Sequence, residues 1–391
     1  MQVLYIRKGI TMNLHAEIEN LREKYLSVWA DVCNIESPTS DKLGVDQVGE
    51  YFIRLAEAQE WKVEIFEQPL AGNVVCITMN PHACLPPVTF SGHMDTVHPK
   101  GVFGYPAVHM DDEKIYGPGV VDCKGGVVAG FLAMEALAKV GFVNRPVRML
   151  LQSDEEVSSR LSNKATINYI CEKAKDSIAF FNLEGHNNGD ACLGRKGIIS
   201  FEFTVFGQEA HSSACAVRGA NAILDASYKI IELEKIKDDA GLTCNCGVIS
   251  GGTVRNTVPG KCVFTVDVRY ATQEQYEWIC EYVKNLANTV HVAGCKCTVE
   301  IFSGRPAMHR TEKNLHLFER MNEIYAKNGM LPLKERNRNA GSDAAEITQA
   351  GIPCVECMGV RGGGMHCREE FAFISSLTEA AERLARVVLD I

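Results

Sequence analysis

Short apolar runs that end in acidic residues or histidine are the clearest pattern in the first half of the chain. Apolar runs of about four to eight residues bounded by polar or glycine residues are typical of buried strands in a parallel sheet. In open α/β sheets the functional crevice lies beyond the carboxyl ends of the strands. The pattern therefore predicts that the residues after these runs gather at one edge of a sheet. The runs and the residues that follow them are 88–92 with His93 and Asp95, 147–152 with 154–156, and 178–183 with Glu184.

Segments with helical periodicity alternate with these predicted strands. Residues 42–59 carry apolar side chains at three- and four-residue spacing, which predicts an amphipathic helix. Residues 125–140 are apolar over a broad face, which predicts a helix that packs against the sheet, and residues 377–387 predict a closing amphipathic helix. Alternation of strands and helices indicates a layered α/β domain.

The pattern changes in the middle of the chain. Residues 200–206 and 262–268 alternate strictly between apolar and polar side chains, which is typical of a sheet with one buried and one open face. Helices fit at 219–234 and 273–290, and a further strand fits near 296–302. This order of strand, helix, strands, helix and strand resembles a ferredoxin-like domain.

The two patterns predict two domains, of which the first is discontinuous. Residues 1–194 and 304–391 are expected to form the α/β domain, and residues 195–303 an inserted α+β ferredoxin-like domain. The length of 391 residues agrees with two or three domains.

Charge and composition argue against several classes of partner. The formal net charge is −9 and the chain has no basic run, which argues against nucleic acid or an anionic membrane as a partner. No apolar stretch approaches the roughly 20 residues that span a bilayer, and the N-terminal residues lack the apolar stretch of a signal peptide. We therefore expect a cytoplasmic protein whose sixteen cysteines are reduced thiols.

The acidic and histidine residues at the strand ends suggest a metal site, although each has a simpler explanation by itself. His93 alone fits a hydrogen-bonded core histidine, and Asp122, in the glycine-rich stretch 116–126, fits a helix N-cap. Asp154, Glu155 and Glu156 alone fit a solvated loop. Together, however, these acids would repel one another unless a cation lay among them, and one acid can bind metal while its neighbour acts as a general base.

His366 adds a second histidine to this set, after the glycine run 362–364. Imidazole and carboxylate are ordinary zinc ligands, and two histidines with three carboxylates suit two zinc ions. Three carboxylates and one hydroxide would balance the charge of the two ions. The chain has no Gly-x-Ser-x-Gly elbow, no His-Glu-x-x-His helix and no phosphate-binding loop. The pattern therefore favours a hydrolytic metal site.

These motifs resemble those of the co-catalytic zinc aminohydrolases, the family that includes glutamate carboxypeptidase, aminoacylase, acetylornithine deacetylase and peptidase T. The long spacing between His93 and Tyr116 is most similar to the glutamate-carboxypeptidase branch. The matching stretches occur in family order and cover most of the chain. They are residues 91–97, 116–126, 153–156, 207–213, 341–344 and 363–366.

The resemblance implies a mixed-sheet catalytic domain that holds two Zn²⁺ ions, for which Co²⁺ or Mn²⁺ are substitutes. It implies that Glu155 is the general base and that Asp95 is the partner of His93. Asp122 would bridge the two ions. The implied ligands are His93, Asp122 and Glu184 for one ion, and Asp122, Glu156 and His366 for the other.

In the inserted domain, the resemblance implies three residues that act on the substrate. His211 matches a histidine that reaches the site of a neighbouring subunit and polarises the scissile carbonyl group, so the inserted domain is expected to be a lid through which a homodimer forms. Asn256 and Arg269 match groups that hold the substrate, Arg269 through a carboxylate. The strict alternation of 262–268 also places Arg269 on the open face of the sheet, where a guanidinium can bind a carboxylate in bidentate fashion.

The expected activity is metal-dependent hydrolysis of an amide bond next to a free carboxylate. The substrate would be the C-terminal residue of a small peptide or an N-acyl amino acid. The alternatives are an acetylornithine-type deacetylase, a di- or tripeptidase, and a non-catalytic member of the family that binds an amino-acid-like ligand.

Overall fold

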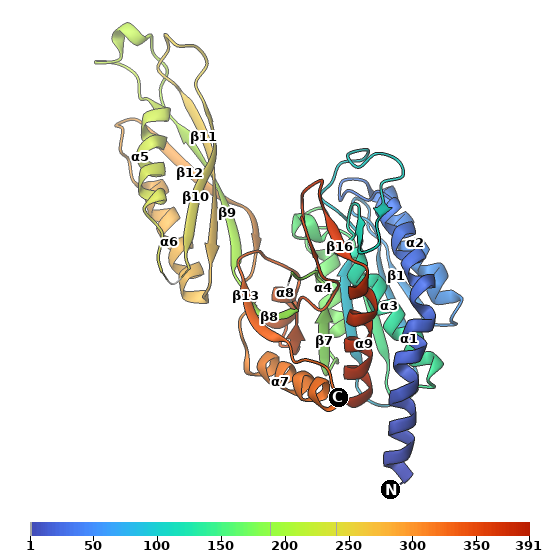
Figure 1. The fold of residues 1–391 in the computed structure, drawn as a ribbon. Coiled ribbons are helices and arrows are strands. Elements are labelled where there is room, and N and C mark those ends of the chain that lie inside the picture. Colours follow the sequence, from blue (N-terminus) through green and yellow to red (C-terminus); the bar gives the residue numbers. More distant parts are fainter. Residues whose placement is uncertain (1, 188, 240) are drawn as a thin grey trace. The chain divides into compact units, whose positions relative to one another are not determined.

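The computed structural model describes residues 2–187, 189–239 and 241–391, with side chains from Leu14 onward (Figure 1). Its internal contacts divide the chain into two units. The first unit comprises Met1–Leu193, Arg310–Asn337 and Glu346–Ile391, and the second comprises Gly194–His309 and Arg338–Ala345. The insert expected at 195–303 lies within the second unit. The return of residues 338–345 to that unit was not expected from the sequence.

A six-stranded mixed sheet forms the centre of the first unit. β2 runs antiparallel to both of its neighbours, whereas β6, β3, β7 and β14 run parallel to one another. The three apolar runs of the sequence are β3, β6 and β7, so the predicted α/β fold with a mixed sheet is confirmed. In spatial order the strands are β1 (Lys62–Phe66), β2 (Val74–Met79), β6 (Val147–Gln152), β3 (Val88–His93), β7 (Ala179–Asn182) and β14 (Cys354–Val355).

Helices cover both faces of this sheet. Neighbouring residues of a strand point to opposite faces. On β6, Met149 lies against Gly130 of α3 (Lys124–Lys139), whereas Arg148 donates to the main-chain oxygen of Lys173 on α4 (Ala165–Ala174). α3 and α4 therefore lie on opposite sides, and the first unit has three layers.

The α3 side of the sheet holds most of the core. α1 (Gln2–Asn34) and α9 (Ser375–Asp390) contact α3, and α9 in turn contacts α7 (Glu312–Lys327). Phe52 of α2 (Lys42–Glu57) stacks on Phe131 of α3 with ring centroids 4.8 Å apart. Among the described residues, none of these helices or any other is long and apolar enough to cross a bilayer.

A small four-stranded sheet brings the last part of the chain beside its middle. β16 (Phe371–Phe373) pairs with both β15 (Gly362–Gly363) and β5 (Lys114–Tyr116), and β5 pairs with β4 (His109–Met110). The segment that carries His366 thus lies beside the segment that leads to Asp122. Two further elements are the strand pair β8 (Asp190–Arg195) and β13 (Lys334–Arg338), and the short helix α8 (Ala344–Gln349).

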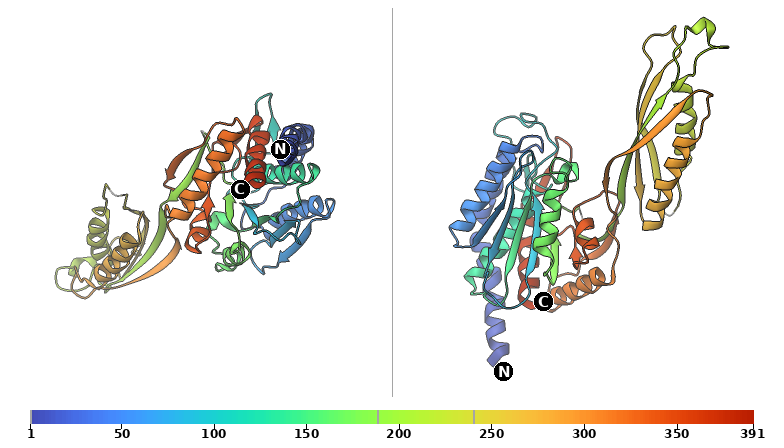
Figure 2. Two further views of the ribbon diagram at one scale, coloured as in Figure 1. Left: turned by 90° about the horizontal axis from the view of Figure 1, so that it is seen from below. Right: turned by 180° about the vertical axis from the view of Figure 1, so that it is seen from behind.

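The second unit is an antiparallel sheet covered on one face by two helices. Every second residue of β9 and β11 is buried against α5 (Ala222–Glu234) and α6 (Gln273–Asn288), which lie on the same side of the sheet (Figures 1 and 2). The order of strands and helices along the chain is the one predicted, so the inserted ferredoxin-like fold is confirmed. In spatial order its strands are β10 (Thr243–Gly251), β11 (Lys261–Tyr270), β9 (Gly197–Phe206) and β12 (Lys296–Arg305).

Candidate metal centre

The carboxyl ends of three parallel strands deliver candidate ligands to one edge of the large sheet. β3 ends at His93, and β7 ends two residues before Glu184. β6 is followed by a short 3-10 turn, Glu155–Val157, which contains the last two acids of the triplet and is preceded by the first, Asp154. The sequence predicted this convergence, because parallel strands present their carboxyl ends on the same side.

The buried imidazole of His93 faces two carboxylates. Its Nδ1 lies 2.9 Å from the main-chain oxygen of Asp95 and 3.4 Å from Oδ1 of that residue. Its Nε2 lies 3.0 Å from Oδ1 of Asp122 and 3.6 Å from Oε1 of Glu184. The contact at Nδ1 fixes the ring so that Nε2 is presented to the carboxylates, as is usual for a histidine that binds metal.

Asp122 directs one carboxylate oxygen to each of two histidines. Oδ1 faces Nε2 of His93, and Oδ2 lies 3.2 Å from Nε2 of His366, which itself lies 3.3 Å from Oε2 of Glu156. Two groups of donors, one around His93 and one around His366, therefore share Asp122. In this arrangement the carboxylate of Asp122 could bridge two cations.

The donor set also agrees with metal binding. Ligand atoms of His93, Asp122 and Glu156 all lie within 4.8 Å of one another. Imidazole nitrogens and carboxylate oxygens are the ligands that zinc takes at catalytic sites. The residues present therefore fit divalent cations. Two such ions would be held by His93, Asp122 and Glu184, and by Asp122, Glu156 and His366.

The pKa values in this cluster show how strongly its groups interact. Contacts with Asp122 and Glu156 raise the pKa of His366 to about 11. Burial raises the pKa of Glu156 to about 8. Burial also tends to raise the pKa of Asp122, but its contacts with His366 and His93 outweigh burial and lower the pKa of this carboxyl group. Positive charge beside both oxygens thus keeps Asp122 ionised.

The carboxylate of Asp95 makes shorter contacts with the main chain of the turn 155–157 than with the ring of His93. Its side chain is fully buried. Oδ1 accepts the main-chain N–H of Glu155 at 3.2 Å, and Oδ2 accepts that of Glu156 at 3.2 Å and the hydroxyl of Thr39 at 2.8 Å. The expected role as partner of His93 is filled mainly by the main-chain oxygen of Asp95, while its carboxylate positions Glu155 and Glu156.

The three consecutive acids of the triplet lie in different environments. Asp154 is fully buried and turns away from the site, because it accepts the main-chain N–H of Ser162 at 2.9 Å and the hydroxyl of Thr166 at 2.6 Å. Glu155 is 8% exposed, and Glu156 faces His366. The repulsion expected from the sequence is thus reduced by separating the three carboxylates.

The sequence did not predict a role for Glu370. This carboxylate is buried beside the turn that carries Asp122, whereas its neighbour Glu369 is exposed. Both acids follow His366 closely, and no local pattern distinguishes them. The sequence showed only that both acids lie within four residues of His366, a candidate ligand.

The second unit carries the three predicted substrate-binding residues at two separate ends of its sheet. Arg269 pairs with Ile198 near the start of β9. His211 follows the other end of β9, forms a bridge with Thr257, and lies beside Asn256, whose main-chain oxygen accepts the N–H of Ser212 at 2.9 Å. The structure therefore brings His211 and Asn256 together and separates both from Arg269.

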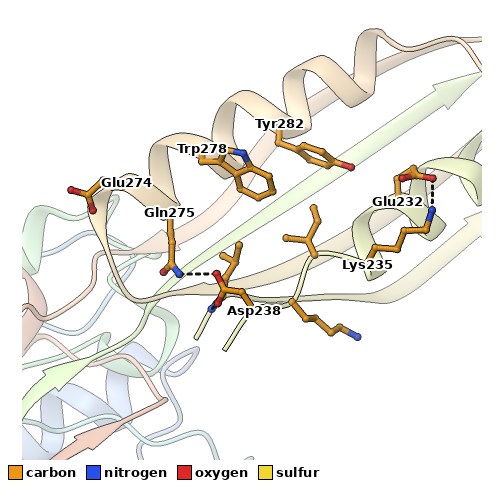
Figure 3. Close-up of a pocket in the computed structure, with 10 residues that line it drawn as sticks. Glu232, Lys235, Asp238, Glu274, Gln275, Trp278 and Tyr282 are labelled. Carbon is orange, nitrogen blue, oxygen red and sulfur yellow. Dashed lines mark hydrogen bonds and ion pairs between the residues drawn. The ribbon is translucent and has the colours of Figure 1, made fainter. Parts of the chain in front are cut away.

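A pocket of about 550 Å³ lies on the helical layer of the second unit (Figure 3). Trp278 and Tyr282 stack there with ring centroids 5.1 Å apart. Gln275 donates to Asp238 at 3.2 Å, and a lysine and a glutamate on its wall form an ion pair. No predicted site residue lines this pocket, and we assign it no part in the reaction.

Comparison with known proteins identifies the family. The model of peptidase family M20/M25/M40 matches residues 89–390. The chain belongs to this family. It is 29% identical to carboxypeptidase G2 from Pseudomonas sp., over 76% of this chain and 72% of that protein. It is 26% identical to a succinyl-diaminopimelate desuccinylase from Wolinella succinogenes, over 81% of this chain and 85% of that protein.

Solved structures of the family share the fold. A tripeptidase from Staphylococcus aureus has a TM-score of 0.76 at 20% identity and covers 94% of this chain and 97% of its own. A dinuclear metal-binding M20 peptidase from Bacillus subtilis has a TM-score of 0.68 at 16% identity and covers 95% of this chain and 99% of its own. The predicted family and enzyme class are confirmed: the protein is a metallopeptidase or amidohydrolase of family M20.

We expect the purified protein to bind about two divalent cations per chain, as a bridged site requires. His366→Ala should remove one of them, because it deletes a ligand of one ion only. Asp122→Ala should weaken both, because both ions share its carboxylate. Elemental analysis after dialysis against zinc measures this, with His109→Ala, an exposed histidine, as the control. Retention of both ions by Asp122→Ala would contradict the shared-ligand arrangement.

Proposed function

We propose that the protein is a dizinc hydrolase that cleaves an amide bond next to a free carboxylate. The products would be the C-terminal residue of a small peptide or the amino acid of an N-acyl amino acid. The observation that carries the proposal is the pair of contacts from Asp122, 3.0 Å to His93 and 3.2 Å to His366. Two cations bound there would polarise the scissile carbonyl group and lower the pKa of water.

Glu155 is the proposed general base. It accepts a proton from the attacking water and later delivers it to the nitrogen of the leaving amine. Its position supports this role, because the turn that it begins is held by Asp95 and also carries Glu156. The base and a metal ligand are therefore adjacent residues of one rigid turn.

Arg269 is proposed to bind the free carboxylate of the substrate. Its Nε donates to Oδ1 of Asp267 at 2.7 Å, and its Nη2 lies 3.3 Å from Oδ2 of the same residue. This contact fixes one edge of the guanidinium and leaves the other edge for bidentate binding of a carboxylate.

His211 is proposed to donate a hydrogen bond to the scissile carbonyl oxygen. Its Nδ1 accepts the main-chain N–H of Ser213 at 3.3 Å and lies 2.8 Å from the hydroxyl oxygen of the same residue, which can also donate to it. In a neutral imidazole with Nδ1 as the acceptor, the proton is on Nε2. Nε2 is then a hydrogen-bond donor of the kind that stabilises a developing oxyanion.

His211 and Arg269 of one chain are too far apart to act on one small substrate. Arg269 pairs with Ile198, and the eight residues from there to Phe206 extend over about 26 Å at 3.3 Å per residue. Pairing continues beyond Phe206, with Gly207 bonded to Gly260. An extended dipeptide spans only about 7 Å. This separation supports the proposal that a partner copy supplies His211 and Asn256.

The second unit also has a surface suited to a homodimer. β10 is an edge strand and exposes Val248 and Ile249. α5 contacts β10 and exposes Leu224, Tyr228 and Ile231, which are spaced along one side of the helix. An open strand edge beside an apolar stripe is a template for pairing with another chain. We therefore propose that the dimer forms through this side of the second unit.

The alternative activity is that of a deacylase or a di- or tripeptidase. The relatives include a desuccinylase, and the solved structures include a tripeptidase. A panel of acyl-amino acids, acetylornithine and dipeptides separates these activities. Turnover of dipeptides with a blocked C-terminus would exclude the role proposed for Arg269.

The Glu155→Gln protein should keep both metal ions and lose about 10²- to 10⁴-fold in kcat, the usual contribution of a general base. The amide keeps the shape of the side chain but cannot accept the proton. The matched control is Glu369→Gln, an exposed acid in the segment of His366, which should keep normal kcat. Near-normal turnover by Glu155→Gln would exclude it as the base.

Mixing two inactive variants tests the shared site. Glu155→Gln retains His211, and His211→Ala retains an intact metal centre, so a mixed dimer contains one complete site. Random exchange of subunits should restore about a quarter of wild-type activity, as expected for a two-fold dimer. Native mass spectrometry verifies that mixed dimers form. Mixed dimers without restored activity, or a monomeric wild-type protein with full activity, would contradict the proposal.

A further inference from the structure

A cavity of about 610 Å³ in the first unit lies directly beside Glu156. Its lining combines apolar side chains, among them Val97 and Val157, with the exposed Ser40 and the ion-pairing Lys100. Glu156 belongs both to this lining and to the candidate metal centre. Glu156 therefore joins the lining of the cavity to the candidate metal centre.

The walls of this cavity are fixed relative to the metal centre. The segment around Thr39 and the segment around Thr96 are joined by hydrogen bonds from Thr39 N to Thr96 O, at 3.1 Å, and from Thr96 N to Ser37 O, at 2.9 Å. The hydroxyl of Thr39 also donates to Asp95, the residue that positions Glu155 and Glu156. A ligand in the cavity would thus be held at a fixed position relative to Glu155 and Glu156.

The charge of the lining indicates which chemical group it accepts. Lys100 is the one cation among the lining residues, and its Nζ pairs with the carboxylate of Asp41, which lies in the same lining. An additional carboxylate of the ligand would have to compete with Asp41 for this lysine. An uncharged group of the ligand would not have to compete with Asp41. The valine and proline side chains of the lining favour a group that is also apolar.

We propose that this cavity binds the acyl side of the substrate and selects uncharged acyl groups larger than acetyl, such as an aromatic acyl group or an apolar peptide residue. This rests on the proposed function, in which Arg269 holds the leaving amino acid, so that the acyl part extends from the opposite side of the carbonyl carbon. Ligand pockets usually measure about 300–1,000 Å³. An acetyl group would leave most of this cavity unfilled.

The test compares N-acetyl, N-benzoyl and N-succinyl derivatives of the amino acid that the enzyme releases fastest. The zinc-loaded wild type should favour benzoyl over acetyl in kcat/KM by about tenfold or more, and over succinyl as well. Val97→Trp and Ser40→Trp, which fill the cavity from two segments, should each reduce the benzoyl-to-acetyl ratio by about tenfold. Leu43→Trp, at an exposed position outside the lining, is the matched control and should leave the ratio unchanged.

Each outcome of this test decides the proposal. A wild-type ratio near one, a preference for succinyl, or an unchanged ratio in both tryptophan variants would overturn it, while hydrolysis of the acetyl compound would leave the proposed function intact. Failure of the zinc-loaded enzyme to cleave any of the three compounds while it cleaves dipeptides would overturn this inference alone. Failure to cleave the dipeptides as well would refute the proposed function, and this inference with it.

The carboxylate of Glu370 is buried beside the turn that presents Asp122. Its Oε1 accepts the main-chain N–H groups of Val121 at 3.0 Å and Asp122 at 3.1 Å. Its Oε2 accepts the N–H of Gly119 at 3.2 Å and lies 3.0 Å from Nε2 of His98. One side chain therefore accepts three main-chain N–H groups of the turn that presents Asp122.

We infer that Glu370 is a positioning residue for the metal centre. It lies four residues after His366, so its carboxylate ties the segment of one ligand to the turn of another. His366 and Asp122 are candidate ligands of the same ion, with Nε2 and Oδ2 at 3.2 Å. By fixing the two segments to each other, Glu370 sets the distance between these ligands before any metal binds. Groups that orient ligands in this way typically contribute about 10- to 100-fold to metal affinity.

Glu370→Gln tests this inference, because an amide NH₂ group replaces one oxygen that accepts N–H groups. Its affinity for Zn²⁺, measured by competition with a chelating indicator, should fall by about 10- to 100-fold. The absorption spectrum of the Co²⁺-substituted protein should also change. The matched control is Glu135→Gln, a buried glutamate whose Oε2 lies 2.7 Å from the Tyr25 hydroxyl of α1. Wild-type affinity in Glu370→Gln, or an equal loss in both variants, would overturn the assignment.

Discussion

The carboxylate of Asp122 is the group on which the rest of this site depends. Its two oxygens face two different histidines, and Glu184 and Glu156 complete the donor groups on either side. Several acids at this spacing, largely buried, would repel one another without compensating positive charge. A pair of divalent cations would supply that charge. In the proposed site, one shared carboxylate would fix the positions of both ions.

Strand ends, the start of a helix and a turn together place the ligands of this site. Parallel strands bring His93, Glu156 and Glu184 to one edge, as ligand sites in open α/β sheets require. The start of α3 packs so closely on the strand end before Glu184 that a Cβ atom at Gly126 would lie 1.9 Å from the main-chain oxygen of Leu183. His366 adopts a left-handed backbone conformation, with φ of +63°, in the segment that precedes β16. Glycine and turn geometry thus place the ligands that strands cannot supply.

The sequence predicted much of this organisation because the spacing of apolar residues along the chain indicates which side chains are buried. The apolar runs became β3, β6 and β7, and alternation between 262 and 268 became β11. Contacts between distant segments were not predictable in this way. No local pattern distinguished Glu370 from Glu369, revealed that Asp154 turns away from Glu156, or indicated that residues 338–345 join the second unit. The separation of Arg269 from His211 also became apparent only from the strand register.

The proposed site requires that two cations share Asp122. Anomalous X-ray diffraction from zinc-loaded crystals, collected at the zinc absorption edge, tests it most directly. We expect two peaks about 3.5–4 Å apart, with one oxygen of Asp122 bound to each. A single peak at full zinc occupancy, or two peaks without a common bond to Asp122, would contradict it.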